Sequence, residues 1–218
     1  MNRQFEERAL ARAVQEYSNQ NVSSALGFRN RGSSKYALDK YEEAIKDYNR
    51  SIKLDPDSSG TFICRARAFL KIGSLSEAFY DAAHAYEMTI INDSPEDYIR
   101  LAMLFEECKR FDFVIDCINQ YLRHVKELDF YHDDLGELWA VKKGYKTTSN
   151  CTTGNIVQTD WLGDAEGILN RIQKQFESDG KQQKLFPFSI IDELRKDLSI
   201  TKKKMNQSIR KLKVQNND

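Results

Sequence analysis

The 218-residue sequence has few of the residues that interrupt or cross-link a chain: three prolines, ten glycines and four cysteines. It contains no run of about eighteen apolar residues, so it predicts no membrane-spanning helix. The first thirty residues are polar and lack the apolar core of a signal peptide, so we expect no secretion. The cysteines form no CxxC pair, and without export they are expected to be free thiols: Cys64, Cys108, Cys117 and Cys151.

Sequence motifs of catalysis and cofactor binding are also missing. No GxxxxGK[ST] loop or strand-linked GxGxxG occurs that would hold a phosphate group, and no serine elbow or cysteine–histidine signature provides a nucleophile. The three histidines have no HExxH or CxxC companion for a metal site: His84, His124 and His132. The sequence therefore predicts a protein that is not an enzyme and has no metal and no cofactor.

Neither sign of charge is in excess, because 33 Lys and Arg balance 33 Asp and Glu. The distribution is uneven, however. Residues 181–218 hold ten basic and four acidic residues, which is ten minus four, or +6, and leaves −6 on the first 180 residues. A mildly acidic body with a basic tail gives no global electrostatic argument for nucleic-acid binding.

What the sequence does contain is a helical unit that recurs at an offset of 34 residues. Residues 28–56 have the pattern of two short helices with small residues where the backbones approach, and Pro56 ends the second helix. The second unit matches it at several positions: Phe28 with Phe62, Gly32 with Ala66, Tyr41 with Leu75 and Ala44 with Ala78. A weaker third unit is shifted by two further residues and places Val114 at the position of Ala44.

A 34-residue helix-turn-helix unit with small, aromatic and proline positions resembles the tetratricopeptide repeat. The resemblance covers three units, residues 25–58, 59–92 and 95–128, and its alternative is a generic helical bundle. It implies an all-α fold, a right-handed α-solenoid of three helix pairs with a concave groove. One pair cannot bury its own apolar face, so stacked pairs form a continuous core.

The remaining segments are expected to flank this solenoid. They are an N-terminal helix within residues 1–24, a capping helix at 129–144, a linker at 145–160 and C-terminal helices with the basic tail at 161–218. In residues 189–214 an imperfect heptad seam includes Ile191, Leu194, Leu198, Met205 and Leu212. That seam is compatible with self-association as a coiled coil and equally with packing back onto residues 161–178.

The resemblance also implies that the first helix of each pair lines the groove. By register, the candidate peptide-binding residues are Arg29, Asn30, Ser33, Cys64, Arg67, Lys71 and Arg100, with Ile63, Ile99, Met103 and Glu106 on the same helices. Four of the seven candidates are basic, which favours an acidic extended peptide or a terminal carboxylate, because Arg binds carboxylate through two parallel hydrogen bonds. The alternative is that these are ordinary solvated charges.

The co-chaperone branch of the family grips the acidic C-terminal tails of the seventy- or ninety-kilodalton heat-shock chaperones with a carboxylate clamp. Its lysine, asparagine, asparagine, lysine and arginine positions correspond here to Arg29, Ser33, Cys64, Glu96 and Arg100. Only Arg100 is identical, and Arg29 keeps the charge. Ser33 and Cys64 replace two amides, and Glu96 reverses a charge. This degenerate clamp argues against standard binding of chaperone tails.

We therefore expect a protein–protein interaction adaptor that holds a peptide or partner segment in the groove. Its expected location is the cytoplasm, with the nucleus as the alternative, and no membrane partner is expected. The alternatives in function are a co-chaperone, or a nucleic-acid-associated protein that uses the basic residues Lys202, Lys203, Lys204, Arg210, Lys211 and Lys213. No aromatic residue interleaves these, so the sequence does not favour nucleic acid.

Overall fold

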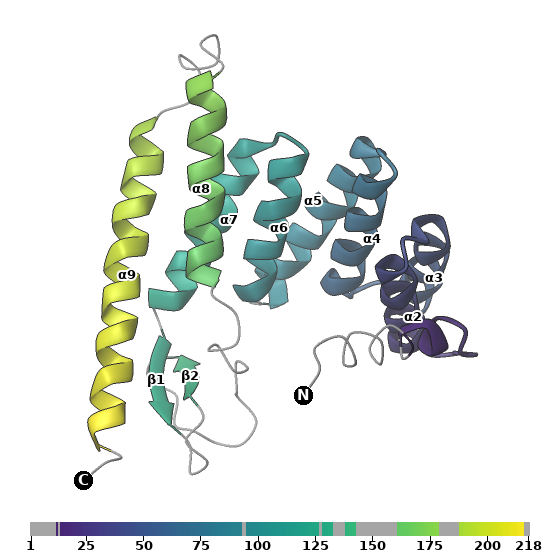
Figure 1. Cartoon of the computed structure of the whole chain (residues 1–218), viewed down its shortest axis with the longest axis horizontal. Helices are drawn as coiled ribbons and strands as arrows, with labels where there is room; N and C mark the ends of the chain where they lie inside the picture. Colours follow the sequence, from purple (N-terminus) through teal and green to yellow (C-terminus); the bar gives the residue numbers. More distant parts are fainter. Residues whose placement is uncertain are drawn as a thin grey trace. The chain divides into compact units, whose positions relative to one another are not determined.

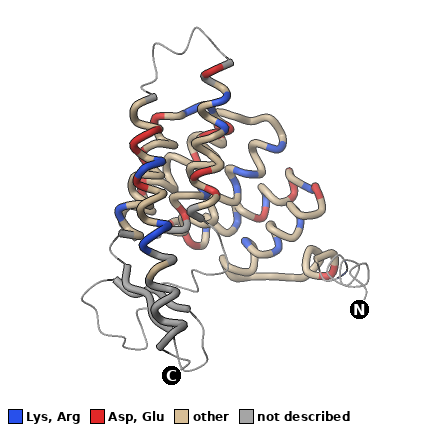
Figure 2. Tube along the Cα trace, turned by 60° about the vertical axis from the view of Figure 1, so that its left-hand side comes forward, with Lys and Arg blue, Asp and Glu red and all other residues tan. Residues whose placement is uncertain are grey.

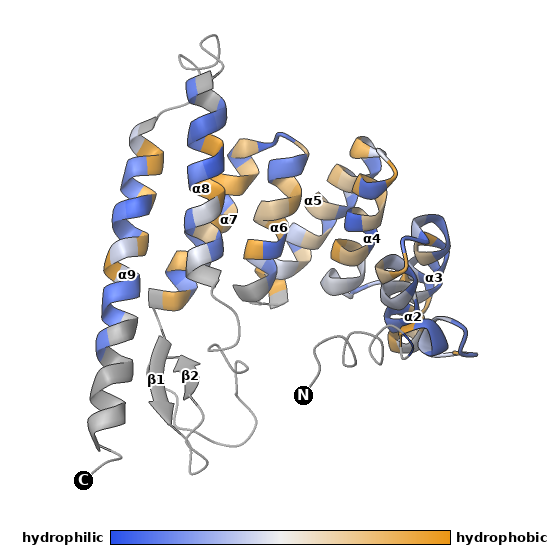
Figure 3. Cartoon of the chain, in the orientation of Figure 1, coloured by the Kyte–Doolittle hydropathy of each residue, from blue (hydrophilic) through white to orange (hydrophobic). Residues whose placement is uncertain are grey.

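The computed structural model describes residues 12, 14–92, 95–126, 128–132, 138–142, 161–178 and 188–215 (Figure 1). The chain divides into two compact units, Met1–Arg110 and Phe111–Asp218. None of the described helices is both long enough and apolar enough to cross a membrane. Hydrophilic and hydrophobic residues alternate around the helices, as an amphipathic helix requires when only one face is buried (Figure 3).

The first unit is built from helices that pack in pairs. These helices are α2 (Ala25–Ala37), α3 (Tyr41–Leu54), α4 (Ser59–Lys71), α5 (Leu75–Asn92) and α6 (Pro95–Glu107). α2 packs on α3 and α4 packs on α5, while α3 contacts α4 and α5 contacts α6. α4 also contacts both α2 and α6, so the first helices of successive pairs lie next to one another. The predicted fold of stacked helix pairs is therefore confirmed.

Small residues set the distance between paired helices. A Cβ atom on Gly32 would lie 2.7 Å from Cε1 of Tyr48, so α2 approaches α3 as closely as the ring allows. Ala44, Ala66 and Ala78 are fully buried at the corresponding positions of the two pairs. Close packing at these points is why the sequence repeats small residues there.

The turns that end the first helices repeat as well. Asp39, Gly73 and Lys109 all have positive φ, at 59°, 78° and 60°. In each turn the next residue donates its backbone N–H to a carbonyl five residues earlier, as in Lys40 to Lys35 at 3.0 Å and Arg110 to Phe105 at 2.8 Å. This is the Schellman motif, which satisfies the last carbonyls of a helix. The third repeat of the sequence, residues 95–128, keeps this motif at its shifted register, although its turn residue is a lysine.

The second compact unit, Phe111–Asp218, combines helices with a hairpin. It contains α7 (Phe111–Lys126), β1 (Leu128–His132), β2 (Leu138–Lys142), α8 (Trp161–Ser178) and α9 (Phe188–Gln215). β1 and β2 pair antiparallel, with Leu128 opposite Lys142 and His132 opposite Leu138. α9 contacts α7, α8 and β1.

The capping helix predicted at 129–144 is wrong, because the described residues of that segment form these two strands. Phe130, Tyr131, Trp139 and Val141 are aromatic or β-branched, which favours a pleated strand over a helix. The linker predicted at 145–160 lies outside the described residues.

The heptad seam of the last helix is used within the chain. Ile191, Leu194 and Leu198 of α9 are buried, and α9 packs against α8. Arg195 Nη2 donates to Asn170 Oδ1 of α8 at 2.7 Å. Packing back onto residues 161–178 is thus the observed alternative for this part of the seam. Of the N-terminal helix expected within residues 1–24, the structure describes residue 12 and a helical turn at residues 14–18.

Candidate functional site

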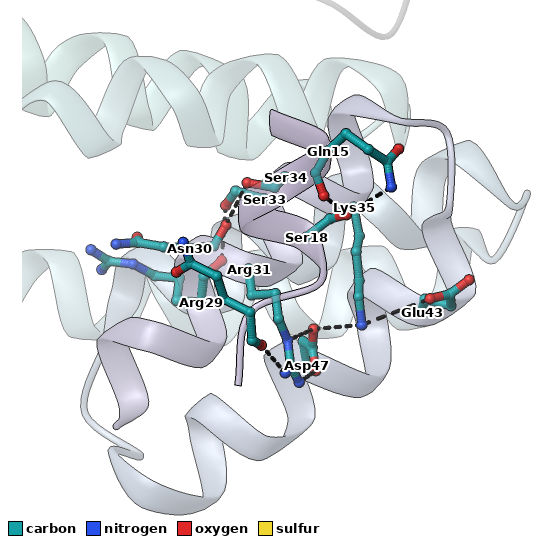
Figure 4. A network of polar contacts seen from close by, with 11 residues as sticks. Gln15, Ser18, Arg29, Asn30, Arg31, Ser33, Ser34, Lys35, Glu43 and Asp47 are labelled. Atoms are coloured by element: carbon teal, nitrogen blue, oxygen red, sulfur yellow. Dashed lines mark hydrogen bonds and ion pairs between the residues drawn. The ribbon is translucent and has the colours of Figure 1, made fainter. Parts of the chain in front are cut away.

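Each of the first two helix pairs is locked by an arginine and a buried aspartate. Arg31 donates from Nε and Nη2 to the two carboxylate oxygens of Asp47 at 2.8 and 2.6 Å, and Lys35 Nζ lies 2.8 Å from the same carboxylate (Figure 4). Arg65 donates to Asp81 in the same way, with both distances at 2.7 Å. Both aspartates are 1% exposed. These arginines are committed to holding the fold and are not available to a ligand.

The same arginines also reach the segment that precedes their own pair. Arg31 Nη1 donates to the backbone carbonyl of Gln20 at 2.8 Å, and Arg65 Nη1 donates to Asn49 Oδ1 at 2.6 Å. Sequence reasoning missed this arrangement. The available signal was an arginine and an aspartate sixteen residues apart in both units at the 34-residue offset. At the shifted register of the third unit stand Leu101 and Cys117, and both are fully buried.

The predicted site residues gather around the thiol of Cys64. This side chain is partly buried on α4 and packs against the core formed by Ala44, Tyr48 and Ala68. Burial raises the pKa of the Cys64 thiol, while the charges of Arg67, Arg29 and Arg100 act to lower it. Because the pKa is raised overall, the thiol is neutral at pH 7. The three positive charges therefore meet at a site without a compensating thiolate.

Ser33 does not take the place of an amide donor. Its hydroxyl donates to the backbone carbonyl of Arg29 within α2 at 3.0 Å, and it accepts from Tyr48 Oη at 3.4 Å. Burial raises the pKa of Tyr48, so the phenol keeps its proton and remains a donor. The single proton of Ser33 is thus used inside its own helix, and the site is left with guanidinium donors.

The three arginines are positioned by their neighbours. The Arg67 guanidinium lies over the ring of Tyr36, 5.2 Å from its centroid, which is a cation–π contact. Arg100 Nη1 lies 3.1 Å from Asp97 Oδ1, and its side chain is 49% exposed. Arg29 reaches the start of α4, where a Cβ on Gly60 would lie 3.4 Å from Arg29 Nη1. We call Arg29, Arg67 and Arg100 around Cys64 the arginine cluster.

Two members of the arginine cluster differ sharply from the arginines two residues away. Within the described part of the chain, no carboxylate pairs with Arg29 or Arg67, whereas Arg31 and Arg65 are each held by an aspartate. Arg67 is exposed and Arg29 is partly exposed. Figure 2 shows basic residues recurring on successive helices of the first unit. The uncompensated charge on α2 and α4 is therefore accessible to an anionic ligand.

The other sequence-predicted residues lie outside this cluster. Asn30 and Lys71 are exposed, and neither is among the groups that act on Cys64. Ile63 is 3% exposed and Ile99 is fully buried, so these two belong to the core and do not line an accessible surface. The side chain of Glu96 is outside the described residues. The structure thus brings together Arg29, Ser33, Cys64, Arg67 and Arg100.

Within the described residues, no group of three or more His, Cys, Asp or Glu side chains is arranged to hold a metal ion. Cys64, Cys108 and Cys117 are free thiols there. The candidate site is therefore described by its charge and its hydrogen-bond donors.

Paired helices, Schellman turns and the 34-residue spacing are the features of a tetratricopeptide repeat, and the tetratricopeptide-repeat family model matches residues 25–58. The resemblance seen in the sequence is thereby confirmed. Among characterised proteins, Hsp70-Hsp90 organizing protein 3 of Arabidopsis thaliana is 27% identical over 96 residues, which is 44% of this chain and 17% of that protein. The Hsp70-Hsp90 organizing protein of Triticum aestivum is 33% identical over 60 residues, covering 28% of this chain and 10% of that protein. The chain thus spans less than a fifth of the length of either relative.

A comparison with solved structures also finds this fold in MamA. The crystal structure of MamA is 10% identical and aligns over 95% of this chain and 98% of its own, with a TM-score of 0.51. At that identity the match concerns the fold alone. The first TPR of Spaghetti (RPAP3) bound to the HSP90 peptide SRMEEVD is 20% identical over 46% of this chain and 79% of its own, with a TM-score of 0.41.

Proposed function

We propose that this chain is an interaction adaptor whose arginine cluster binds an acidic, extended segment of a partner protein. The observation that carries the proposal is that Arg29, Arg67 and Arg100 lie on α2, α4 and α6, where α4 contacts both other helices, and that the charges of all three act on Cys64. Two of them have no carboxylate partner in the described residues. A repeat domain of this class presents such helices side by side, so one extended segment can touch all three.

Physical chemistry favours an acidic ligand here. Guanidinium groups bind carboxylates through paired, charge-assisted hydrogen bonds, which contribute about 1.5–3 kcal/mol each when they form. The contacts also make binding sensitive to salt, because two of the three arginines are exposed.

An acidic ligand could come from more than one class of partner protein. The relatives named as Hsp70-Hsp90 organizing proteins suggest a chaperone tail as one source of an acidic segment. Ser33 and Cys64 stand where the clamp of that branch has amides, and Ser33 donates within its own helix. We therefore propose general acidic-segment binding and keep the co-chaperone role as the alternative.

Isothermal titration tests the proposal with two probes, the peptide SRMEEVD and a seven-residue peptide of Glu and Asp. Reversing Arg67→Glu and Arg100→Glu together is expected to weaken binding of the acidic peptide by at least about a hundredfold, since two charge-assisted contacts are lost. The matched control is Lys46→Glu with Lys53→Glu, two exposed positions on α3 with the same change of charge. Equal binding by both double variants would show that the arginine cluster is not the site.

A nucleic-acid role has less support. Lys202 Nζ lies 3.8 Å from Glu166 Oε2, so one of the basic residues of α9 is paired within the chain. The side chains of Arg210, Lys211 and Lys213 are outside the described residues. We keep this function as an alternative only.

A further inference from the structure

The proposed function leaves open which anion the arginine cluster prefers. Resting on that proposal, we infer that the arginine cluster is a receptor for a phosphate monoester, carried by a phosphorylated Ser or Thr within an acidic segment. Three features carry the inference. They are the charge of the cluster, the kind of donors it offers and the way two of its guanidinium groups are held.

The charge of the cluster matches a dianion. Arg29, Arg67 and Arg100 contribute three positive charges, and Asp97, which binds Arg100, contributes one negative charge. The remaining groups, Cys64, Ser33 and Tyr48, are neutral, and Arg29 and Arg67, which no carboxylate of the described residues pairs with, contribute +2. A phosphate monoester carries about −1.5 to −2 at pH 7, whereas one carboxylate carries −1 and leaves the site undercompensated.

The donors of the cluster are almost all guanidinium N–H groups. The proton of Ser33 is committed to the carbonyl of Arg29, and the proton of Tyr48 points to Ser33. The neutral thiol of Cys64 is only a weak donor. A peptide terminus needs neutral donors to align its main chain as well as its carboxylate. A phosphate monoester presents three strong acceptor oxygens on one compact group, which suits several guanidinium forks and needs no amide donor.

Two of the arginines are already oriented before a ligand arrives. The Arg67 guanidinium rests on the ring of Tyr36 at 5.2 Å, and Arg100 is tied to Asp97 at 3.1 Å. Asp97 is itself fixed, because it accepts a hydrogen bond from Ser59 Oγ at 3.0 Å. Holding these forks in place reduces the conformational entropy lost on binding, which favours a ligand that requires defined geometry.

The test uses three C-terminally amidated acidic peptides of the same seven-residue sequence, with Ser, phosphoserine or Glu at the centre. Isothermal titration with the full chain is expected to give the phosphoserine peptide at least about tenfold tighter binding than the Glu peptide. Inorganic phosphate at millimolar concentration is expected to compete with it. Equal affinity for the phosphoserine and Glu peptides would overturn the phosphate inference and leave acidic-segment binding intact. Failure of all three to bind would count against the proposed function itself.

Arginine-to-lysine variants separate fork geometry from net charge. Arg67→Lys with Arg100→Lys keeps both charges but removes the planar fork, and it is expected to reduce the preference for phosphoserine over Glu at least about threefold. Lys46→Arg with Lys53→Arg is the matched control and is expected to leave the preference unchanged. Circular dichroism of each variant confirms that it is folded. A preference that persists in Arg67→Lys with Arg100→Lys would show that charge alone, and not the guanidinium forks, selects the anion.

Discussion

Arg31 and Asp47 are joined by two parallel hydrogen bonds of 2.8 and 2.6 Å, and the carboxylate that accepts them is buried between α2 and α3. Lys35 completes the neutralisation of this carboxylate at 2.8 Å. The arrangement places three charged side chains at a helix–helix contact, where removing Asp47 leaves Arg31 and Lys35 without their shared partner.

Replacing Asp47 with Ala is expected to destabilise the first unit. Breaking a fully buried ion pair costs about 3–5 kcal/mol, and because the Arg31 side chain still reaches solvent we expect about 2–3 kcal/mol here. Urea unfolding followed by circular dichroism measures the change. Asp57→Ala, in an exposed turn, is the control and should lie close to the wild type. A loss for Asp47→Ala no larger than for the control would contradict the structural role of the pair.

The same carboxylate gives the first unit a stability that depends on pH. Burial acts to raise the pKa of Asp47, but hydrogen bonds from Arg31 and Lys35 outweigh it and hold this pKa below its ordinary value. A carboxylate with a depressed pKa stabilises the fold above its unfolded pKa of about 3.9, and this stability is lost as pH falls through the folded pKa. The difference in unfolding free energy between wild type and Asp47→Asn should therefore be largest near neutral pH and shrink below about pH 4. A constant difference across that range would contradict it.

Gly32 is expected to tolerate no side chain. A Cβ there would lie 2.7 Å from the Tyr48 ring, which is buried and cannot move away. Overpacking of this kind costs about 1–3 kcal/mol, and the better helix propensity of Ala returns at most about 1 kcal/mol. Gly32→Ala should thus lower the urea midpoint. Gly60→Ala, whose Cβ would meet only the flexible end of Arg29 at 3.4 Å, should leave the midpoint unchanged or raise it.

The hydroxyl of Tyr41 is expected to lose its proton at a higher pH than an ordinary tyrosine, although it lies at the surface. Its hydroxyl donates to Asp39 Oδ1, and this hydrogen bond, followed by desolvation, raises the pKa of Tyr41 to about 12. Ultraviolet difference titration of the wild type against Tyr41→Phe should isolate this group. In Asp39→Asn the pKa should move back toward the ordinary value of about 10. Identical titration of Tyr41 in both backgrounds would show that the contact with Asp39 does not form in solution.

The helix pairs could be predicted because their signals are local and repeat. The spacing of Gly32 and Ala44, seen again 34 residues later in Ala66 and Ala78, identified the helix pairs, and Pro56 marked the end of the first pair. Register alone also selected Arg29, Ser33, Cys64, Arg67 and Arg100, which the structure brings together. It did not separate them from Asn30 and Lys71, because side-chain direction around a helix depends on contacts with helices far along the chain.

Two features escaped sequence reasoning for opposite reasons. The hairpin of β1 and β2 depends on pairing across residues 133–137, and the apolar spacing of the second strand alone also fits a helix. The Arg31–Asp47 and Arg65–Asp81 pairs were missed because a charged residue in a helical pattern is ordinarily assigned to the solvated face. Only the coincidence of both pairs at the repeat offset distinguishes them.

Arg65 bonds not only to Asp81 in its own pair but also to Asn49 in the pair before it, and Arg31 likewise reaches back to Gln20. Each of these guanidinium groups therefore recognises what precedes it: a side-chain amide in one case and a backbone carbonyl in the other. The two repeats, residues 25–58 and 59–92, are therefore not interchangeable. A chimaera that exchanged residues 25–58 with residues 59–92 would place Ala83 where Arg65 finds Asn49, so Arg31 in the second position would lack that side-chain acceptor. The order of the two repeats is therefore specified in part by the hydrogen bonds between them.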